Sequence, residues 1–125
     1  MSTDNKTDKK EDKKLNLEQI IFSLVLHAGN ARAKAYDALD AAESGDFESA
    51  DKRLDEADDE FYEGHKFQNK LIREQSGNVT PNFLVIHAQD QLMTALSEKN
   101  LIKRELELYK KVSSLEKRIK ALETK

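Results

Sequence analysis

The chain has 125 residues and a formal net charge of −3, with 36% charged and 38% hydrophobic residues. This length predicts one small domain, and the absence of cysteine excludes disulfides, thiolate metal sites and thiol catalysis. The acidic balance provides no basic surface for nucleic acid, and no apolar run approaches the ~20 residues that span a bilayer.

Residues 1–14 form a charged N-terminal segment. They are mostly lysine, acidic and asparagine residues, with no hydrophobe beyond Met1. Such a segment cannot bury enough apolar surface to repay its ordering entropy, so we predict a disordered tail, a solvated leader. Because it lacks an apolar signal core, the expected location is cytoplasmic.

The first helix is predicted to begin at Asn16, which acts as its N-cap. Gln19 stands at the position of a capping-box partner, and Leu15, just before the cap, can pack against the first turn as a hydrophobic staple. Apolar or small residues then alternate at spacings of four and three, which is typical of a helix in a bundle. They are Leu17, Ile21, Leu24, Ala28, Ala31, Ala35, Ala38 and Ala42. Gly45 is the expected C-terminal stop, and Asp46 the expected cap of the next helix.

The second helix, from Phe47 onward, has a complementary apolar stripe and an acidic opposite face. The stripe comprises Phe47, Ala50, Leu54, Ala57, Phe61, Gly64, Gln68 and Leu71, and the acidic face includes Asp51, Asp55, Asp58 and Asp59. Residues 76–78, Ser-Gly-Asn, are predicted to break the chain. Thr80 is the predicted N-cap of a third helix and Pro81 its first residue.

The third helix has no clear stop in the sequence. Leucine recurs every seven residues with β-branched residues between, at Leu101, Leu108, Leu115 and Leu122, and at Val112 and Ile119. This pattern is typical of a coiled coil and predicts a C-terminal helical extension over residues 112–125. Followed backwards, the same face reaches Ser97, Thr94, Asp90 and His87. Asp90 and Leu108 are eighteen residues apart, about five turns, so the surface that would join different chains passes through Asp90.

His87 and Asp90 share one face of a segment that otherwise reads as buried helix, since they lie three residues apart. Burying an unpaired carboxylate costs several kcal/mol, so Asp90 requires a partner, a metal or a proton. The residues alone leave two interpretations of each. His87 is either a structural histidine or a nucleophile that accepts a phosphoryl group. Asp90 pairs with Arg32, Arg53 or a lysine, or meets its copies on a threefold axis around a hard cation.

Four separated motifs occur in order along the chain. They are H-A-G-N-A-R-A-K-A-Y at 27–36, G-D-F at 45–47, G-H-K-F-Q at 64–68 and I-H-A-Q-D-Q-L-M-T at 86–94. Over about residues 17–111, the chain resembles the lactose/cellobiose-type enzyme IIA proteins of the bacterial sugar phosphotransferase system. Gln91 stands where that family commonly has histidine, and His27 where it commonly has asparagine. Neither departure touches His87 or Asp90.

The resemblance implies an all-α fold, an antiparallel three-helix bundle over residues 15–111 that assembles into a homotrimer. The tail 1–14 precedes this domain, and the extension 112–125 continues it as a coiled coil. The resemblance also implies a phosphotransferase that accepts phosphate from HPr on His87, the catalytic residue, and passes it to a cysteine of enzyme IIB. The pathway serves disaccharide uptake through membrane enzyme IIC. Asp90 is implied as ligand of a divalent metal, Mg²⁺, shared between three subunits.

Two other functions fit parts of the pattern. One is a non-enzymatic trimeric helical scaffold. The other is a histidine phosphotransfer module of two-component signalling, although that class usually has four helices and a lysine near its histidine. No phosphate-binding loop or dinucleotide motif is present, so phosphate must come from another protein. The sugar is not specified, because this subunit never touches it.

Four further polar residues lie near the candidate site or on the other helices. Gln89 and Gln91 are candidates to hydrogen-bond phosphoryl oxygens or to orient the imidazole. His27 and His65 are predicted to be structural. A di-metal carboxylate bundle would need Glu-x-x-His, and the residue three before His65 is Tyr62.

Overall fold

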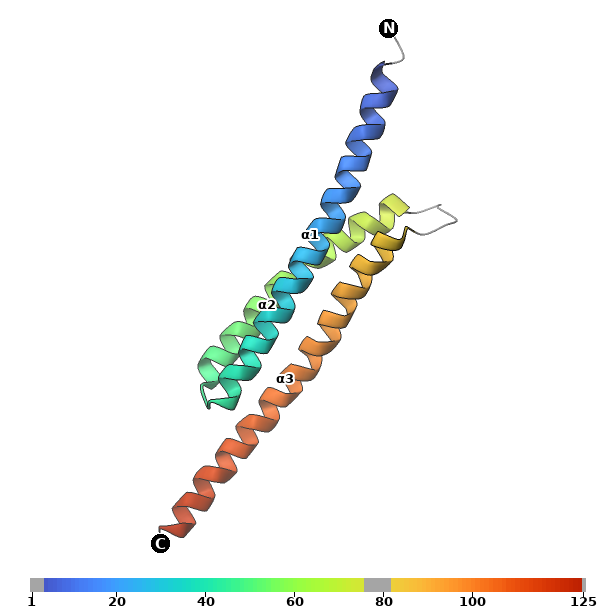
Figure 1. The fold of residues 1–125 in the computed structure, drawn as a ribbon. Coiled ribbons are helices and arrows are strands. Elements are labelled where there is room, and N and C mark those ends of the chain that lie inside the picture. The colour runs from blue at the N-terminus through green and yellow to red at the C-terminus, as the bar shows by residue number, and fades with distance from the viewer. Residues whose placement is uncertain (1–3, 76–81, 125) are drawn as a thin grey trace.

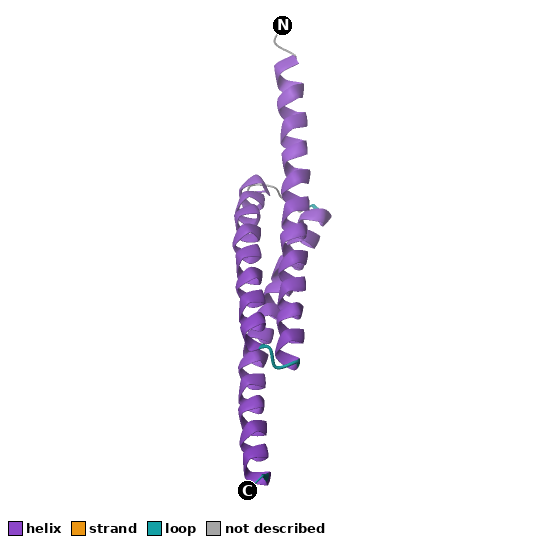
Figure 2. Ribbon diagram, turned by 90° about the vertical axis from the view of Figure 1, so that its left-hand side faces the viewer, coloured by secondary structure: helices purple, strands orange, loops and turns teal. Residues whose placement is uncertain are grey.

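The computed structural model describes residues 4–75 and 82–124, which form three helices: α1 (Asp4–Glu43), α2 (Phe47–Gln75) and α3 (Phe83–Glu123). Consecutive helices run antiparallel along one long axis (Figures 1 and 2). These two ranges contain no strand. The predicted all-α, antiparallel three-helix protomer is therefore confirmed. None of the described helices has a stretch apolar and long enough to cross a membrane.

Helix α1 begins earlier than the sequence predicted. Its backbone is helical from Asp4, so Asn16 lies inside the helix and does not cap it. Residues 4–14 are thus helical where a disordered tail was expected, and residues 1–3 lie outside the described ranges. The segment contains no glycine or proline, and its lysine and glutamate residues favour helix. Extending an existing helix gains one hydrogen bond per added residue, so nothing stops it at Asn16.

The turn between α1 and α2 is confirmed at Gly45 and Asp46. Gly45 has a φ of +84°, which costs a residue without a side chain little. Its N–H donates to Ala42 O at 3.0 Å, and the Asp46 N–H donates to Ala41 O at 2.9 Å. These two bonds close the end of α1 as a Schellman motif. Asp46 Oδ1 then accepts from the Ser49 N–H at 3.1 Å and caps α2.

Helix α3 begins at Phe83, with Asn82 as its N-cap. Asn82 Oδ1 accepts a hydrogen bond from the Leu84 N–H at 2.9 Å. The predicted chain break at 76–78 and the predicted cap and first residue, Thr80 and Pro81, lie outside the described ranges.

The core consists of two clusters along the bundle axis, both of which include residues of α1. The cluster nearer the start of α3 contains large side chains, namely Leu24, Phe61, Leu71, Val85 and Leu92, together with Ala28, Ala31, Ala88 and Ala95. The cluster nearer the α1–α2 turn is mostly alanine: Ala35, Ala38, Ala42, Ala50 and Ala57, with Leu54, Ile102 and Leu106. The predicted stripes of α1 and α2 supply most of both clusters.

Helix α3 carries two apolar stripes, and only one packs against its own chain. The buried stripe is Val85, Ala88, Leu92, Ala95, Lys99, Ile102 and Leu106. The heptad residues point away from it: Leu101 and Leu108 are each 60% exposed. His87 and Asp90 lie on the outward side and are exposed. The expectation that they sit in a buried stretch is therefore wrong for a single chain.

Lys99 is the one charged residue among the buried side chains of the described ranges, and its burial was not predicted from the sequence. Its Nζ lies 2.6 Å from Asp58 Oδ1 on α2 and 5.7 Å from the centre of the Phe61 ring. The ion pair and the aromatic face together replace the water that the ammonium loses.

Candidate active site

His87 is held on the surface of α3 by the buried residues on either side of it. Val85, Ala88 and Leu92 anchor the first turns of the helix in the core, and this rotation directs His87 outward. The imidazole makes no hydrogen bond or ion pair with any residue in the described ranges. Among the described residues, His87 is therefore an exposed imidazole without a hydrogen-bonding partner and not a core histidine.

Exposed apolar side chains surround His87 in sequence. Phe83 is 79% exposed, Leu84 56% and Ile86 43%. Three large apolar side chains left in water on one helical segment are typical of a surface that contacts another protein. Phe83 and Leu84 lie four and three residues before His87, so they share its helical face and form an apolar rim beside the imidazole.

Asp90 has no ion pair in the described part of the chain, and its carboxylate is exposed. Arg32, one predicted partner, instead donates from Nε to Glu98 Oε2 at 3.0 Å and from Nη2 to Thr94 Oγ1 at 2.9 Å. Arg53, the other, pairs with a glutamate of its own helix. Among the described side chains, Asp90 therefore pairs with neither arginine nor any lysine, contrary to the ion-pair interpretation. Water solvates the carboxylate, so a single chain leaves it available.

The glutamines that flank Asp90 have their oxygens held by other helices. Gln68 Nε2 donates to Gln89 Oε1 at 2.7 Å, and Arg32 Nη1 donates to Gln91 Oε1 at 3.2 Å. These bonds orient the amide NH₂ groups, which are the groups that would donate to phosphoryl oxygens. Both glutamines were predicted near the site, but the local sequence pattern does not indicate these two partners.

The other two histidines have hydrogen-bonding partners, as their structural interpretation requires. His27 Nδ1 lies 2.7 Å from Glu60 Oε2 on α2, and its ring stacks on Phe67 with centroids 5.6 Å apart. His65 Nδ1 lies 2.9 Å from Gln68 Oε1. His27 therefore links α1 to α2, whereas the His65 contact lies within α2.

No group of three metal-ligating side chains occurs within the described ranges of one chain. Asp90 on its own supplies one carboxylate, so it can serve only a metal whose remaining ligands come from other chains or from water. Carboxylate oxygen is a donor that suits Mg²⁺.

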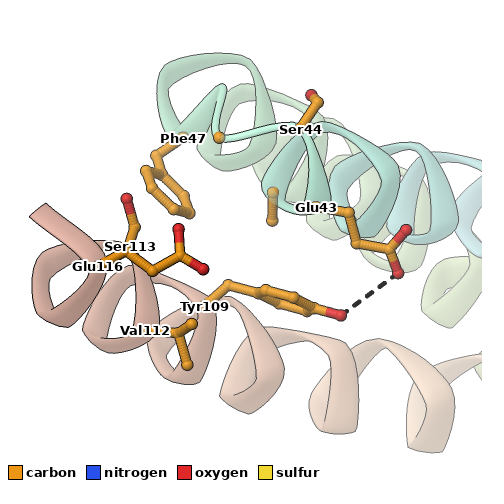
Figure 3. Close-up of a pocket in the computed structure, with 9 residues that line it drawn as sticks. Glu43, Ser44, Phe47, Tyr109, Val112, Ser113 and Glu116 are labelled. Atoms are coloured by element: carbon orange, nitrogen blue, oxygen red, sulfur yellow. Dashed lines mark hydrogen bonds between the residues drawn. The ribbon is translucent and has the colours of Figure 1, made fainter. Parts of the chain in front are cut away.

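A hollow of about 230 Å³ lies away from His87, between the α1–α2 turn and α3 (Figure 3). The Tyr109 hydroxyl donates to Glu43 Oε1 at 3.4 Å across its rim. The negative charge of Glu43 raises the pKa of Tyr109. This hollow holds no histidine, and it includes Val112 and Glu116 of the C-terminal extension.

The family model for "PTS system, Lactose/Cellobiose specific IIA subunit" matches residues 19–110, a span that contains both His87 and Asp90. The chain belongs to this family. The lichenan-specific phosphotransferase enzyme IIA component of Bacillus subtilis is 41% identical over 99 residues, covering 78% of this chain and 90% of that protein. The N,N'-diacetylchitobiose-specific EIIA component of Escherichia coli K12 is 34% identical and covers 91% and 99% respectively.

Solved structures of IIA proteins have the same fold. The cellobiose-specific enzyme IIA of Bacillus anthracis matches with a TM-score of 0.73 at 39% identity, over 78% of this chain and 92% of that one. The chitobiose IIA of Escherichia coli, solved in complex with HPr, matches with a TM-score of 0.71 at 34% identity, over 78% and 96%. The resemblance read from the four motifs is confirmed.

Proposed function

We propose that this IIA protein is a phosphocarrier that accepts phosphate from HPr on His87 and passes it to enzyme IIB, so that a disaccharide can enter through membrane enzyme IIC. The observation that carries the proposal is the exposed imidazole of His87 inside the matched family segment, which has no hydrogen-bonding partner among the described residues. Because the protein would exchange phosphate with HPr and enzyme IIB, we propose that it lies in the cytoplasm with them.

The proposed transfer requires one reactive group from this chain, the imidazole of His87. A ring nitrogen of His87 attacks the phosphorus atom of the phosphoryl group carried by HPr, and the bond from phosphorus to HPr breaks as a new P–N bond forms. In the second transfer a thiolate of enzyme IIB attacks the same phosphorus and His87 leaves. Phosphoryl transfer depends on in-line positioning and charge neutralisation, and an open imidazole in an apolar rim lets each partner complete the site.

A relative supports HPr as the donor. The chitobiose IIA of Escherichia coli forms a solved complex with HPr. This chain shares its fold over 96% of that protein's length, and Phe83, Leu84 and Ile86 provide an exposed apolar surface beside His87.

The proposal includes a homotrimer. One chain leaves large apolar side chains uncovered on α1 as well as on α3, among them Phe22 at 69% and Leu26 at 47% exposure. Apolar surface on two helices of a small domain favours burial against copies of the same chain. In a trimer with α3 at the centre, three Asp90 carboxylates would approach one axis, where their repulsion requires a cation. A divalent ion such as Mg²⁺, held by Asp90 of each chain, would supply that charge.

The scaffold alternative differs in one measurable property. A scaffold needs no accessible nucleophile, so replacing His87 would change no phosphate transfer. The two-component alternative loses its basis, because the described ranges form three helices and the chain belongs to the IIA family.

Phosphorylation is the direct test. The protein is incubated with phosphoenolpyruvate, enzyme I and catalytic HPr, and acid-labile, base-stable phosphate is measured on the chain. Wild type should be labelled stoichiometrically and His87→Ala should not be labelled. His27→Asn, which alters a histidine bonded to Glu60 on another face, is the matched control and should behave as wild type. Labelling of His87→Ala as fast as wild type would refute the proposal.

A further inference from the structure

Four residues of α3 form a stripe that begins at His87. They are His87, Gln91, Thr94 and Glu98, at spacings of four, three and four, so they lie on one face of the helix over about three turns. Residues four apart are neighbours on a helical surface, so Gln91 is next to His87. Because helical side chains lean toward the N-terminus, we expect the Gln91 amide over the turn that carries His87.

The other three residues of this stripe are all bonded to Arg32 of α1. Its Nε donates to Glu98 Oε2 at 3.0 Å, its Nη1 to Gln91 Oε1 at 3.2 Å and its Nη2 to Thr94 Oγ1 at 2.9 Å. Each nitrogen of the planar guanidinium thus has its own acceptor, and the three bonds together fix its position and its tilt. Arg32, Gln91 and Glu98 are half-buried, so water competes less for these bonds than at an open surface.

The bond to Arg32 determines which end of the Gln91 amide remains free. A guanidinium group carries donors only, so the amide presents its oxygen to Arg32. The Nε2 group, with two N–H donors, lies on the other side of the amide and makes no hydrogen bond within the described ranges. The charge of Arg32 polarises the amide, which strengthens these two donors.

From these contacts we infer that Arg32 is a positioning residue for a phosphoryl group on His87, and that it acts through Gln91. Arg32 holds the Gln91 oxygen, and the Gln91 Nε2 group donates to a phosphoryl oxygen when His87 carries the phosphate. The inference rests on the proposed function, because it concerns the phosphorylated form of His87. No covalent bond changes at Arg32 or Gln91, so both stabilise the phosphorylated form without reacting.

A purely structural role of Arg32 would depend on a different contact. Its ion pair with Glu98 joins opposite charges between α1 and α3, and a residue that only links these helices would act mainly through that pair. Glu98→Gln weakens the ion pair and leaves the Gln91 amide bonded to Arg32. This variant is therefore the matched control for the positioning role.

Nuclear magnetic resonance tests the contact without a partner protein. Phosphoramidate transfers its phosphoryl group to an imidazole nitrogen and releases ammonia, and the side-chain amides of the full-length protein are compared before and after. The Gln91 amide protons should shift downfield in wild type, those of Gln19 should not, and His87→Ala should abolish the shift. Arg32→Leu should reduce the shift at least about twofold. Arg32→Lys, which keeps a charge beside Glu98 but lacks the fork of donors, should do the same and serves if Arg32→Leu does not fold.

Exchange of phosphate with HPr measures the size of the effect. The equilibrium constant for transfer from phosphorylated HPr should fall about tenfold in Gln91→Leu, because a hydrogen bond to a charged group is lost. Arg32→Leu should lower the constant by a similar factor, and the double variant should lower it no further. Glu98→Gln should melt at a lower temperature but keep the constant within about twofold of wild type.

The outcomes separate this inference from the proposed function. A wild-type protein that takes no phosphate from HPr would contradict the proposed function, and the phosphoramidate experiment would still test the contact. An unshifted Gln91 amide in the phosphorylated protein would overturn the inference. So would an Arg32→Leu variant that leaves the transfer constant unchanged, or that lowers it equally with and without Gln91.

Discussion

A Cβ atom on Gly64 of α2 would lie 2.9 Å from Leu92 Cδ1 of α3 and 3.6 Å from His27 Cβ of α1. The absence of a side chain at Gly64 therefore lets three helices approach one another at one level. Leu92 is fully buried and belongs to the large-residue core cluster, so a Cβ at position 64 would force the end of its side chain to shift within the core. The close approach sets how α3, and with it His87, rests on α2.

Gly64→Ala should destabilise the protein by about 1 kcal/mol. Alanine gains about 1 kcal/mol of helix propensity, but overpacking a well-filled core costs about 1–3 kcal/mol. Gly29→Ala is the matched control, because a Cβ at Gly29 meets no atom within 4 Å. It should stabilise by about 0.5–1 kcal/mol. Urea unfolding of both variants measures the difference. Equal stabilisation by the two would show that Leu92 yields freely.

Removing the partner of Lys99 should cost more than removing Lys99. Asp58→Ala leaves an ammonium group whose side chain is only 11% exposed, and we expect a loss of about 1–3 kcal/mol. Lys99→Met keeps the packing volume and should be neutral or stabilising. In the Lys99→Met background, Asp58→Ala should then cost little. A double-mutant cycle of denaturant midpoints checks this, and additive losses would contradict it.

Asp46 makes the start of α2 sensitive to acid. Its hydrogen bonds from the Ser49 side chain and backbone lower the pKa of Asp46. A carboxyl group with a lowered folded pKa stabilises the protein above its unfolded value of about 3.9, and this contribution is lost as pH falls through the folded pKa. Asp46→Ala should therefore melt below wild type at neutral pH, with the gap closing in acid. A gap that stays constant down to acid pH would show that the cap does not depend on charge.

Asp90→Leu separates a shared metal site from an ordinary surface carboxylate. If three Asp90 carboxylates meet, sedimentation of wild type should give about three times the 14.3 kDa chain mass. The variant should keep that mass and melt at or above wild type, because it removes both repulsion and the bound ion. A chelator should lower the melting temperature of wild type only.

The control for this experiment is Asp59→Leu, an exposed aspartate on α2. It should leave the chelator response of wild type intact. A monomer at micromolar concentration, or a wild-type melting curve that chelator does not move, would count against the shared site.

Periodicity and turn chemistry predicted much of this fold. The spacing from Leu24 to Ala42 identified the buried face of α1, and Gly45 with Asp46 identified the turn, because both signals are local. At the start of α1, the charged composition led to the prediction of a disordered segment where the chain is helical. Low hydrophobicity argues against packing, but it does not break a helix that is already formed.

The environment of the candidate site residues was not predicted from the sequence. Helix α3 has apolar residues on two sides, and a sequence does not say which side meets its own chain. Asp90 was therefore assigned a buried position that it does not have. The burial of Lys99 was not predicted, because a charged residue is not expected in an apolar stripe. Its spacing, four residues after Ala95 and three before Ile102, nevertheless places it on the buried face of α3. The bonds from Arg32 to Glu98 and from Gln68 to Gln89 depend on how the helices rotate against one another, which local patterns do not encode.

The division of the core into a large-residue cluster and an alanine cluster has a consequence for local opening. Alanine loses no side-chain freedom on burial but contributes little apolar area. The free energy of local opening should therefore be smaller at the alanine cluster, near the α1–α2 turn. In native-state hydrogen exchange, amides around Ala38 and Ala50 should exchange through local openings. Amides around Leu24 and Leu92 should exchange only when the whole bundle unfolds. The end of the domain that bears His87 is thus the more resistant to local opening, which, under the proposed function, would hold the imidazole in a fixed position for both transfers.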